Sequence, residues 1–123
     1  MCSVPRRPGH KELAGKINAA EERLEDGNWD MGLEYELFIK DCEELGLYTD
    51  EEQTAALKHV MKEVRPEHYR GPQPPRKGSR GKVLDRELFE FVFTSKSLNE
   101  EIYLKFALYK DQLFIVSFHK TRK

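Results

Sequence analysis

The chain has 123 residues, of which 38% are hydrophobic, 11% aromatic and 35% charged, and its formal net charge is −1. The aromatic content argues against intrinsic disorder, and the length suits one domain that needs no disulfides to stabilise its core. Without a signal peptide or an apolar run long enough to cross a bilayer, the sequence predicts a soluble cytoplasmic protein with no membrane partner.

Charge is distributed unevenly along the chain. Residues 1–64 contain 8 Lys/Arg and 15 Asp/Glu, a net charge of −7, whereas residues 65–123 contain 13 and 7, a net charge of +6. Acidic helices could simply be solvated surfaces. Together with the polar strand face described below, however, the basic half favours a polyanionic partner, RNA or DNA.

The chain begins with a segment that lacks apolar periodicity. Residues 1–10 predict a flexible tail, and residues 11–123 are expected to form a single domain. Cys2 lies in the tail and Cys42 in a predicted helix, and neither belongs to a Cys/His pattern with zinc spacing. We therefore expect reduced thiols, no metal site and no cofactor.

Amphipathic segments within residues 11–64 predict three helices. The first is expected over residues 11–26 and the second over residues 31–45. The third follows Thr49 and Glu52, whose spacing is that of a capping box.

A basic loop follows the helices. Residues 70–82 contain three prolines, three glycines and five cations, a composition that disfavours helix and strand. Such a loop can contact the phosphates of a nucleic acid, or it can be a flexible solvated connection. The sequence favours neither interpretation over the other.

Strand-like runs within residues 86–119 complete the domain. Because strand side chains alternate with period two, we expect one wholly apolar face and one mixed face. The predicted apolar face carries Phe89, Phe91, Phe93, Ile102, Leu104, Phe106, Leu108, Phe114, Val116 and Phe118, and the other carries Leu88, Glu90, Val92, Tyr103, Lys105, Ala107, Leu113, Ile115, Ser117 and His119. The sequence therefore predicts an α+β fold in which N-terminal helices pack on one face of a C-terminal antiparallel β-sheet.

The second face carries the residue types that metal-free RNA cleavage requires. A base must take the 2′-hydroxyl proton, cations must stabilise the phosphate, and an acid must protonate the leaving 5′-oxygen. Glu90, Tyr103, Lys105 and His119 on this face, with Arg70 at the start of the loop, are suitable groups. No nucleophile elbow, P-loop, dinucleotide fingerprint or H-E-x-x-H motif points to another reaction.

Each of these residues also has a structural interpretation. His119 can be a surface residue at a strand end, and Glu90 an edge-strand charge that discourages aggregation. Lys105 can pair with Glu90 across the strands, and Tyr103 can be half-buried packing. Their shared face weakens these interpretations without excluding them.

Five segments carry a resemblance to a known family: Glu43-Glu44-Leu45-Gly46-Leu47, His68-Tyr69-Arg70-Gly71-Pro72, Phe91-Val92-Phe93, Ile102-Tyr103-Leu104-Lys105 and Ile115-Val116-Ser117-Phe118-His119. In this order and spacing, residues 35–120 resemble the MqsR-type toxins of bacterial toxin–antitoxin systems, relatives of the RelE-like ribonucleases. The resemblance implies a RelE/MqsR-like sheet packed on helices and cleavage of messenger RNA without a metal. The sequence departs from the family pattern in two ways: its basic loop after Pro72 is longer, and it has Phe where the aromatic strand typically carries Trp.

The resemblance also implies roles for individual residues. Arg70, Glu90, Tyr103 and His119 take the catalytic positions. The expected RNA contacts, which centre on the basic loop, are Tyr69, Arg76, Lys77, Arg80, Lys82 and Lys105. The expected function is that of a toxin-like endoribonuclease, an mRNA interferase that inhibits translation and is neutralised by a cognate antitoxin, with ribosome dependence left open. The alternatives are a non-catalytic RNA-binding module and a degenerate toxin that acts only through antitoxin binding.

Overall fold

The computed structural model describes residues 9–32, 35–72 and 74–121. Most of the predicted tail, residues 1–8, lies outside them, and His10 already belongs to the first helix. In chain order the described elements are α1 (His10–Glu25), β1 (Trp29–Met31), α2 (Tyr35–Glu44), α3 (Asp50–Glu63), the 3₁₀ turns η1 (Pro66–His68) and η2 (Gly81–Val83), β2 (Phe89–Ser95), β3 (Glu100–Tyr109) and β4 (Gln112–Lys120). The α+β class predicted from the sequence is confirmed.

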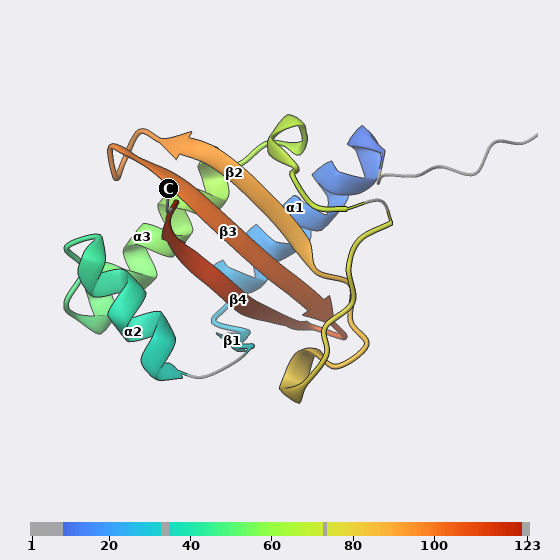
Figure 1. Cartoon of the computed structure of the whole chain (residues 1–123), viewed down its shortest axis with the longest axis horizontal. Coiled ribbons are helices and arrows are strands. Elements are labelled where there is room, and N and C mark those ends of the chain that lie inside the picture. The colour runs from blue at the N-terminus through green and yellow to red at the C-terminus, as the bar shows by residue number, and fades with distance from the viewer. Residues whose placement is uncertain (1–8, 33–34, 73, 122–123) are drawn as a thin grey trace, which may run out of the picture.

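The helices cover one side of the sheet, with α1 and α3 behind it and α2 beside β4 (Figure 1). The predicted capping box begins α3: Glu52 donates its N–H to Thr49 Oγ1 at 3.1 Å, and the Glu52 carboxylate accepts the N–H of Thr49 at 3.1 Å. Because a capping box satisfies donors that the helix itself leaves unpaired, it defines where α3 starts.

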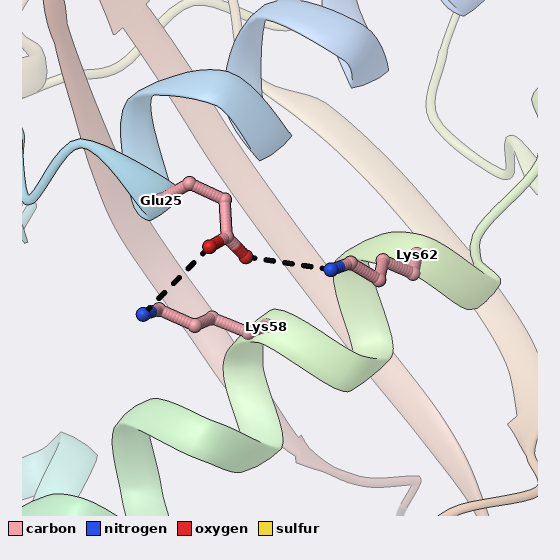
Figure 2. A network of polar contacts seen from close by, with 3 residues as sticks. All are labelled: Glu25, Lys58 and Lys62. Carbon is pink, nitrogen blue, oxygen red and sulfur yellow. Dashed lines mark hydrogen bonds and ion pairs between the residues drawn. The ribbon is translucent and has the colours of Figure 1, made fainter.

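A polar contact joins α1 to α3 at the surface. Figure 2 shows the carboxylate of Glu25 between Lys58 and Lys62, with N–O distances of 3.9 and 3.5 Å. These side chains are 37–54% exposed, so the pairs contribute little stability. Packing of apolar side chains between helices and sheet contributes far more, and the fully buried ones include Leu24, Leu57, Met61, Phe91, Ile102, Leu104 and Phe106.

The sheet has the strand order β1-β4-β3-β2. The pairs β2–β3 and β3–β4 are antiparallel, as predicted. The short strand β1, however, pairs in parallel with β4 and makes the described sheet mixed, which corrects the purely antiparallel prediction. Three residues are too few to show a period, so β1 could not be recognised from the sequence.

A β-bulge in β4 overturns part of the predicted face assignment. Phe106 lies opposite Ile115 and Lys105 opposite Ser117, so Val116 is an extra residue in β4. An extra residue reverses the alternation of side chains on one side of it. As a result Leu113 and Ile115 join the core beneath the helices, although the sequence predicted them on the polar face.

Phe114 and Val116, predicted in the main core, instead lie in a second apolar cluster on the other face of the sheet, together with Val83, Leu88 and Ala107. Val83 ends η2, and Leu88 belongs to the segment that leads from η2 back to β2 along the β2 side of the sheet (Figure 1). One end of the second face is therefore covered by this segment.

The basic loop is more ordered than its composition suggested. The Gly78 N–H donates to the Arg86 carbonyl at 2.9 Å, and the Leu88 N–H donates to the Arg76 carbonyl at 2.7 Å. A Cβ at Gly78 would clash with the backbone carbonyl oxygen of Val83, so only glycine fits this crossing. The 3₁₀ turn η2 also begins inside the segment for which helix and strand were disfavoured.

Within the described ranges, none of the helices combines the length and the apolar composition that a membrane span needs.

Candidate active site

The predicted catalytic side chains lie in two neighbouring rows across the second face of the sheet. Glu90 on β2 lies opposite Lys105 on β3, which lies opposite Ser117 on β4. In the next row Tyr103 lies opposite His119. The shared face that alternation predicted for Glu90, Tyr103, Lys105 and His119 is therefore present, because all four lie on the same side of the bulge.

The Tyr103 hydroxyl donates a hydrogen bond of 2.8 Å to Oε1 of Glu90. The other carboxylate oxygen, Oε2, is buried without a hydrogen-bond partner in the described part of the chain, and Arg76 Nε lies 3.8 Å from it. Burial, and then the hydrogen bond to Glu90 and its negative charge, raise the pKa of Tyr103 above its usual value. Tyr103 therefore stays protonated and acts as a donor to Glu90 near neutral pH.

The imidazole of His119 lies beside the phenol of Tyr103, with ring centroids 5.2 Å apart. His119 Nδ1 lies 2.8 Å from the Lys120 carbonyl oxygen. A carbonyl can only accept, so Nδ1 donates and, in the neutral ring, Nε2 carries the lone pair. Lys105 Nζ lies 5.8 Å from the Tyr103 ring centroid, so positive charge adjoins the phenol.

Arg70 lies next to Glu90 through the backbone. Its N–H donates to the Glu90 carbonyl at 2.8 Å, which extends the sheet by one bridge beyond β2. The guanidinium is exposed and donates to the carbonyls of Glu67 and Tyr69 at 3.2 and 3.0 Å. The main chain of Arg70 thus lies at the site, while its side chain hydrogen-bonds the backbone carbonyls of the preceding residues Glu67 and Tyr69.

Tyr69 was expected to contact RNA, but the structure places it in the core. Its side chain is 2% exposed, packs edge-on against Phe91 at 5.7 Å and donates from its hydroxyl to the Pro72 carbonyl at 2.8 Å. A buried ring cannot stack on a base, so Tyr69 anchors the start of the basic loop.

The remaining loop cations, Arg76, Lys77, Arg80 and Lys82, are exposed. Lys82 Nζ lies 2.5 Å from the carboxylate of Asp30. This hydrogen bond lowers the pKa of Asp30, so Lys82 already has an anionic partner. Lys77 forms an isolated antiparallel β-bridge with Glu87, next to the backbone hydrogen bond from Leu88 to Arg76.

Sequence reasoning undervalued two residues of this face. Arg76 was assigned to phosphate contact, but its guanidinium also approaches Glu90, a contact between loop and sheet that no local pattern reveals. Ser117 shares the face and lies opposite Lys105, and the period-two alternation that identified His119 identifies Ser117 as well.

Two other side chains that can titrate, those of His68 and Cys42, lie away from this face. His68 stacks on Phe93 at 5.2 Å, and burial lowers its pKa. Burial, followed by the neighbouring charge of Asp41, raises the pKa of the free Cys42 thiol to about 12, so Cys42 remains an inert thiol. Among the described residues, no group of at least three His, Cys, Asp or Glu side chains is arranged to hold a metal ion.

No family model, curated protein or solved structure matches this chain.

Proposed function

We propose that this protein is a toxin-like, metal-independent endoribonuclease that cleaves messenger RNA by attack of the 2′-hydroxyl on the adjacent phosphate. The observation that carries the proposal is the hydrogen bond from Tyr103 to Glu90 beside the His119 ring. Lys105 lies near the Tyr103 ring on the same face, and Arg76 approaches Glu90 from the basic loop. An acid–base pair joined to cations matches the needs of this reaction, whereas binding alone requires only cations and aromatic rings.

Proton transfer in the first step would pass through Tyr103. Glu90 is buried at 8% exposure whereas Tyr103 is partly exposed, so a substrate hydroxyl would reach Tyr103 first. We propose that Tyr103 Oη accepts the 2′-hydroxyl proton while its own proton passes to Glu90 Oε1. The 2′-oxygen then bonds to phosphorus, and the bond from phosphorus to the 5′-oxygen breaks.

His119 would complete the reaction. Protonated at Nε2, it donates to the departing 5′-oxygen, and the products are a 2′,3′-cyclic phosphate and a 5′-hydroxyl. Lys105 and Arg76 offset the negative charge that builds up on the phosphate oxygens, a contribution that often dominates catalysis. The Nδ1 bond to the Lys120 carbonyl orients the imidazole for this role.

The cellular role follows from the resemblance. As a toxin-like nuclease the protein would inhibit translation, and a cognate antitoxin would hold it inactive. The exposed cations of the basic loop would contact the RNA backbone on both sides of the cleaved bond.

A second candidate function is RNA binding without cleavage, either as a binding module or as a degenerate toxin that acts through its antitoxin. The observation in its favour is the burial of Glu90 between Tyr103 and Arg76, which is also the arrangement of a structural ion pair.

A cleavage assay with defined products separates the two candidates. Purified protein is incubated with a long RNA in excess EDTA, with and without ribosomes, and the new ends are identified by mass spectrometry. We expect cyclic phosphate and 5′-hydroxyl ends, and no cleavage where a 2′-deoxynucleotide replaces the nucleotide before the scissile bond. Products with 3′-hydroxyl ends would contradict the proposed mechanism, and RNA that is bound but intact under both conditions would favour the binding module.

A further inference from the structure

A second basic site lies on the opposite side of the sheet from Glu90. A groove of about 470 Å³ opens between α1 and the turn that joins β3 to β4. Its charged lining consists of four cations, Lys11, Lys16, Arg23 and Lys110, and one acid, Glu12. An excess of three positive charges around one groove favours an anionic ligand.

Arg23, one of the four cations that line the groove, has an incompletely hydrogen-bonded guanidinium. Its Nη1 atom is buried and has no hydrogen-bond partner among the residues that the structure describes. A buried polar nitrogen without a partner costs free energy, and the cost is larger when the group is charged. Because Nη1 is buried, an anion in the groove would meet the positive charge of Arg23 through the part of the side chain that lines the groove rather than through Nη1.

The shape of the groove suits a small anion. Gly15 and Ala19 lie one helical turn apart in the lining, and a Cβ added at Gly15 would meet no atom within 4 Å. Gly15 and Ala19 thus leave open space between the long side chains of the surrounding lysines and Arg23. Convergent Lys and Arg side chains around open space are the usual means of binding phosphate.

Cations continue from this groove around the β2 side of the sheet. Lys16 Nζ lies 5.6 Å from the ring centroid of Phe89, the residue that precedes Glu90 on edge strand β2. The guanidinium of Arg86 lies 3.6 Å from the ring centroid of Tyr109, and Lys110 Nζ lies 5.4 Å from the same centroid. Positive charge therefore links the groove to the segment that leads into β2.

We propose that the groove between α1 and the β3–β4 turn binds a phosphate group. Its source is either a backbone phosphate of an RNA that extends past the Glu90–His119 face or a free phosphorylated molecule. The first source rests on the proposed function, whereas phosphate binding itself does not.

The first experiment uses inorganic phosphate as the probe. Amide resonances of the intact protein are followed by NMR during titration at constant ionic strength, with chloride as the competing anion. We expect saturable shifts at Gly15, Ala19, Leu108 and Lys110. Gly15→Glu, which places a carboxylate in the groove and raises helix propensity, should abolish them.

Ala55→Glu is the matched control for this variant. Ala55 is an exposed residue of α3 outside the groove, so the substitution adds the same charge and should leave the shifts unchanged. The absence of saturable shifts, or equal shifts in wild type and Gly15→Glu, would overturn the proposal. Circular dichroism melts establish that both variants fold.

The second experiment distinguishes the two sources. The affinity for a 2′-O-methylated RNA, which cannot be cleaved, is measured from low to moderate salt for wild type, Lys110→Asn and Lys96→Asn. Lys110 has a φ of 55°, a conformation that Asn tolerates, and Lys96 lies in the turn at the other end of β3.

If RNA supplies the phosphate, Lys110→Asn should reduce the slope of log K against log salt by about 0.7, and Lys96→Asn should not. If inorganic phosphate shifts the amide resonances of the groove but Lys110→Asn and Lys96→Asn give equal slopes of log K against log salt, the source is a free phosphorylated molecule. Neither readout requires cleavage, so the outcome is independent of whether the protein is a nuclease.

Discussion

Tyr103 and Glu90 lie diagonally across β3 and β2, and the tyrosine hydroxyl donates to the glutamate carboxylate at 2.8 Å. The pair gives Glu90, 8% exposed, its only hydrogen bond from a described side chain. A buried carboxylate that loses such a donor is destabilised more than an exposed one. The stability and the proposed activity of the protein therefore depend on the same contact.

Tyr103→Phe should lower the free energy of unfolding by about 1–3 kcal/mol, because it leaves a buried carboxylate without its donor. It should also abolish the proposed proton relay. Urea unfolding of this variant, of Glu90→Ala, which removes the acceptor, and of the double variant measures the coupling between the two residues. A coupling energy near zero would mean that the hydrogen bond contributes nothing to stability.

His119→Ala should reduce the cleavage rate about 10²-fold or more, the usual size of an acid–base contribution, while the protein folds and binds RNA normally. Single-turnover cleavage and filter binding provide the two measurements. His59→Ala, at an exposed position of α3, is the control and should cleave at the wild-type rate. Equal rates for the two variants would assign His119 to the surface rather than to catalysis.

Lys77→Ala should flatten the salt dependence of RNA binding by about 0.7 log units, the value for one lost phosphate contact with a single strand. Lys82→Ala should flatten it less, because Lys82 already pairs with Asp30. The slopes come from fluorescence anisotropy titrations at several salt concentrations. The reverse order would show that the pairing with Asp30 opens when RNA binds.

Glu63→Ala should destabilise the turn between β2 and β3 in a pH-dependent manner. Burial opposes ionisation of Glu63, but hydrogen bonds from Ser95, Ser97 and the Lys96 N–H outweigh it and lower the pKa below 4.5. Since the folded state has the lower pKa, the contribution of Glu63 to stability is present above pH 4.5 and is lost as the pH falls through the folded pKa.

We therefore expect the difference in unfolding free energy between wild type and Glu63→Ala to be about 1–3 kcal/mol at pH 7 and to shrink below pH 4.5. Urea unfolding at a series of pH values measures it. A difference that stays constant with pH would show that the carboxylate charge plays no part.

Phe91→Ala should lower the free energy of unfolding by about 3–5 kcal/mol, because it leaves a cavity in the core. Phe91 is fully buried and stacks on Phe106 at 5.7 Å. Tyr48→Ala removes an aromatic ring that is 69% exposed and is the control, with an expected change within about 0.5 kcal/mol. Thermal melts of comparable midpoint for the two variants would contradict the placement of β2 in the core.

The sequence by itself determined those features that depend on near neighbours. Thr49 and Glu52 are three residues apart, so their capping box needs no tertiary contact, and the start of α3 follows. Alternation along a regular strand likewise places Glu90 on one face of β2, and Tyr103 and Lys105 together on one face of β3. The helix-then-sheet order of the α+β fold rests on the same local periods.

Only the tertiary structure decided the features that depend on distant residues. The extra residue Val116 reverses the alternation before it, and a bulge has no signal in a run composed of apolar residues. Pairing of β1 with β4, the approach of Arg76 to Glu90 and the burial of Tyr69 beneath the loop join segments far apart in the chain. Packing energy summed over the whole core selects such contacts, and no short stretch of sequence contains that sum.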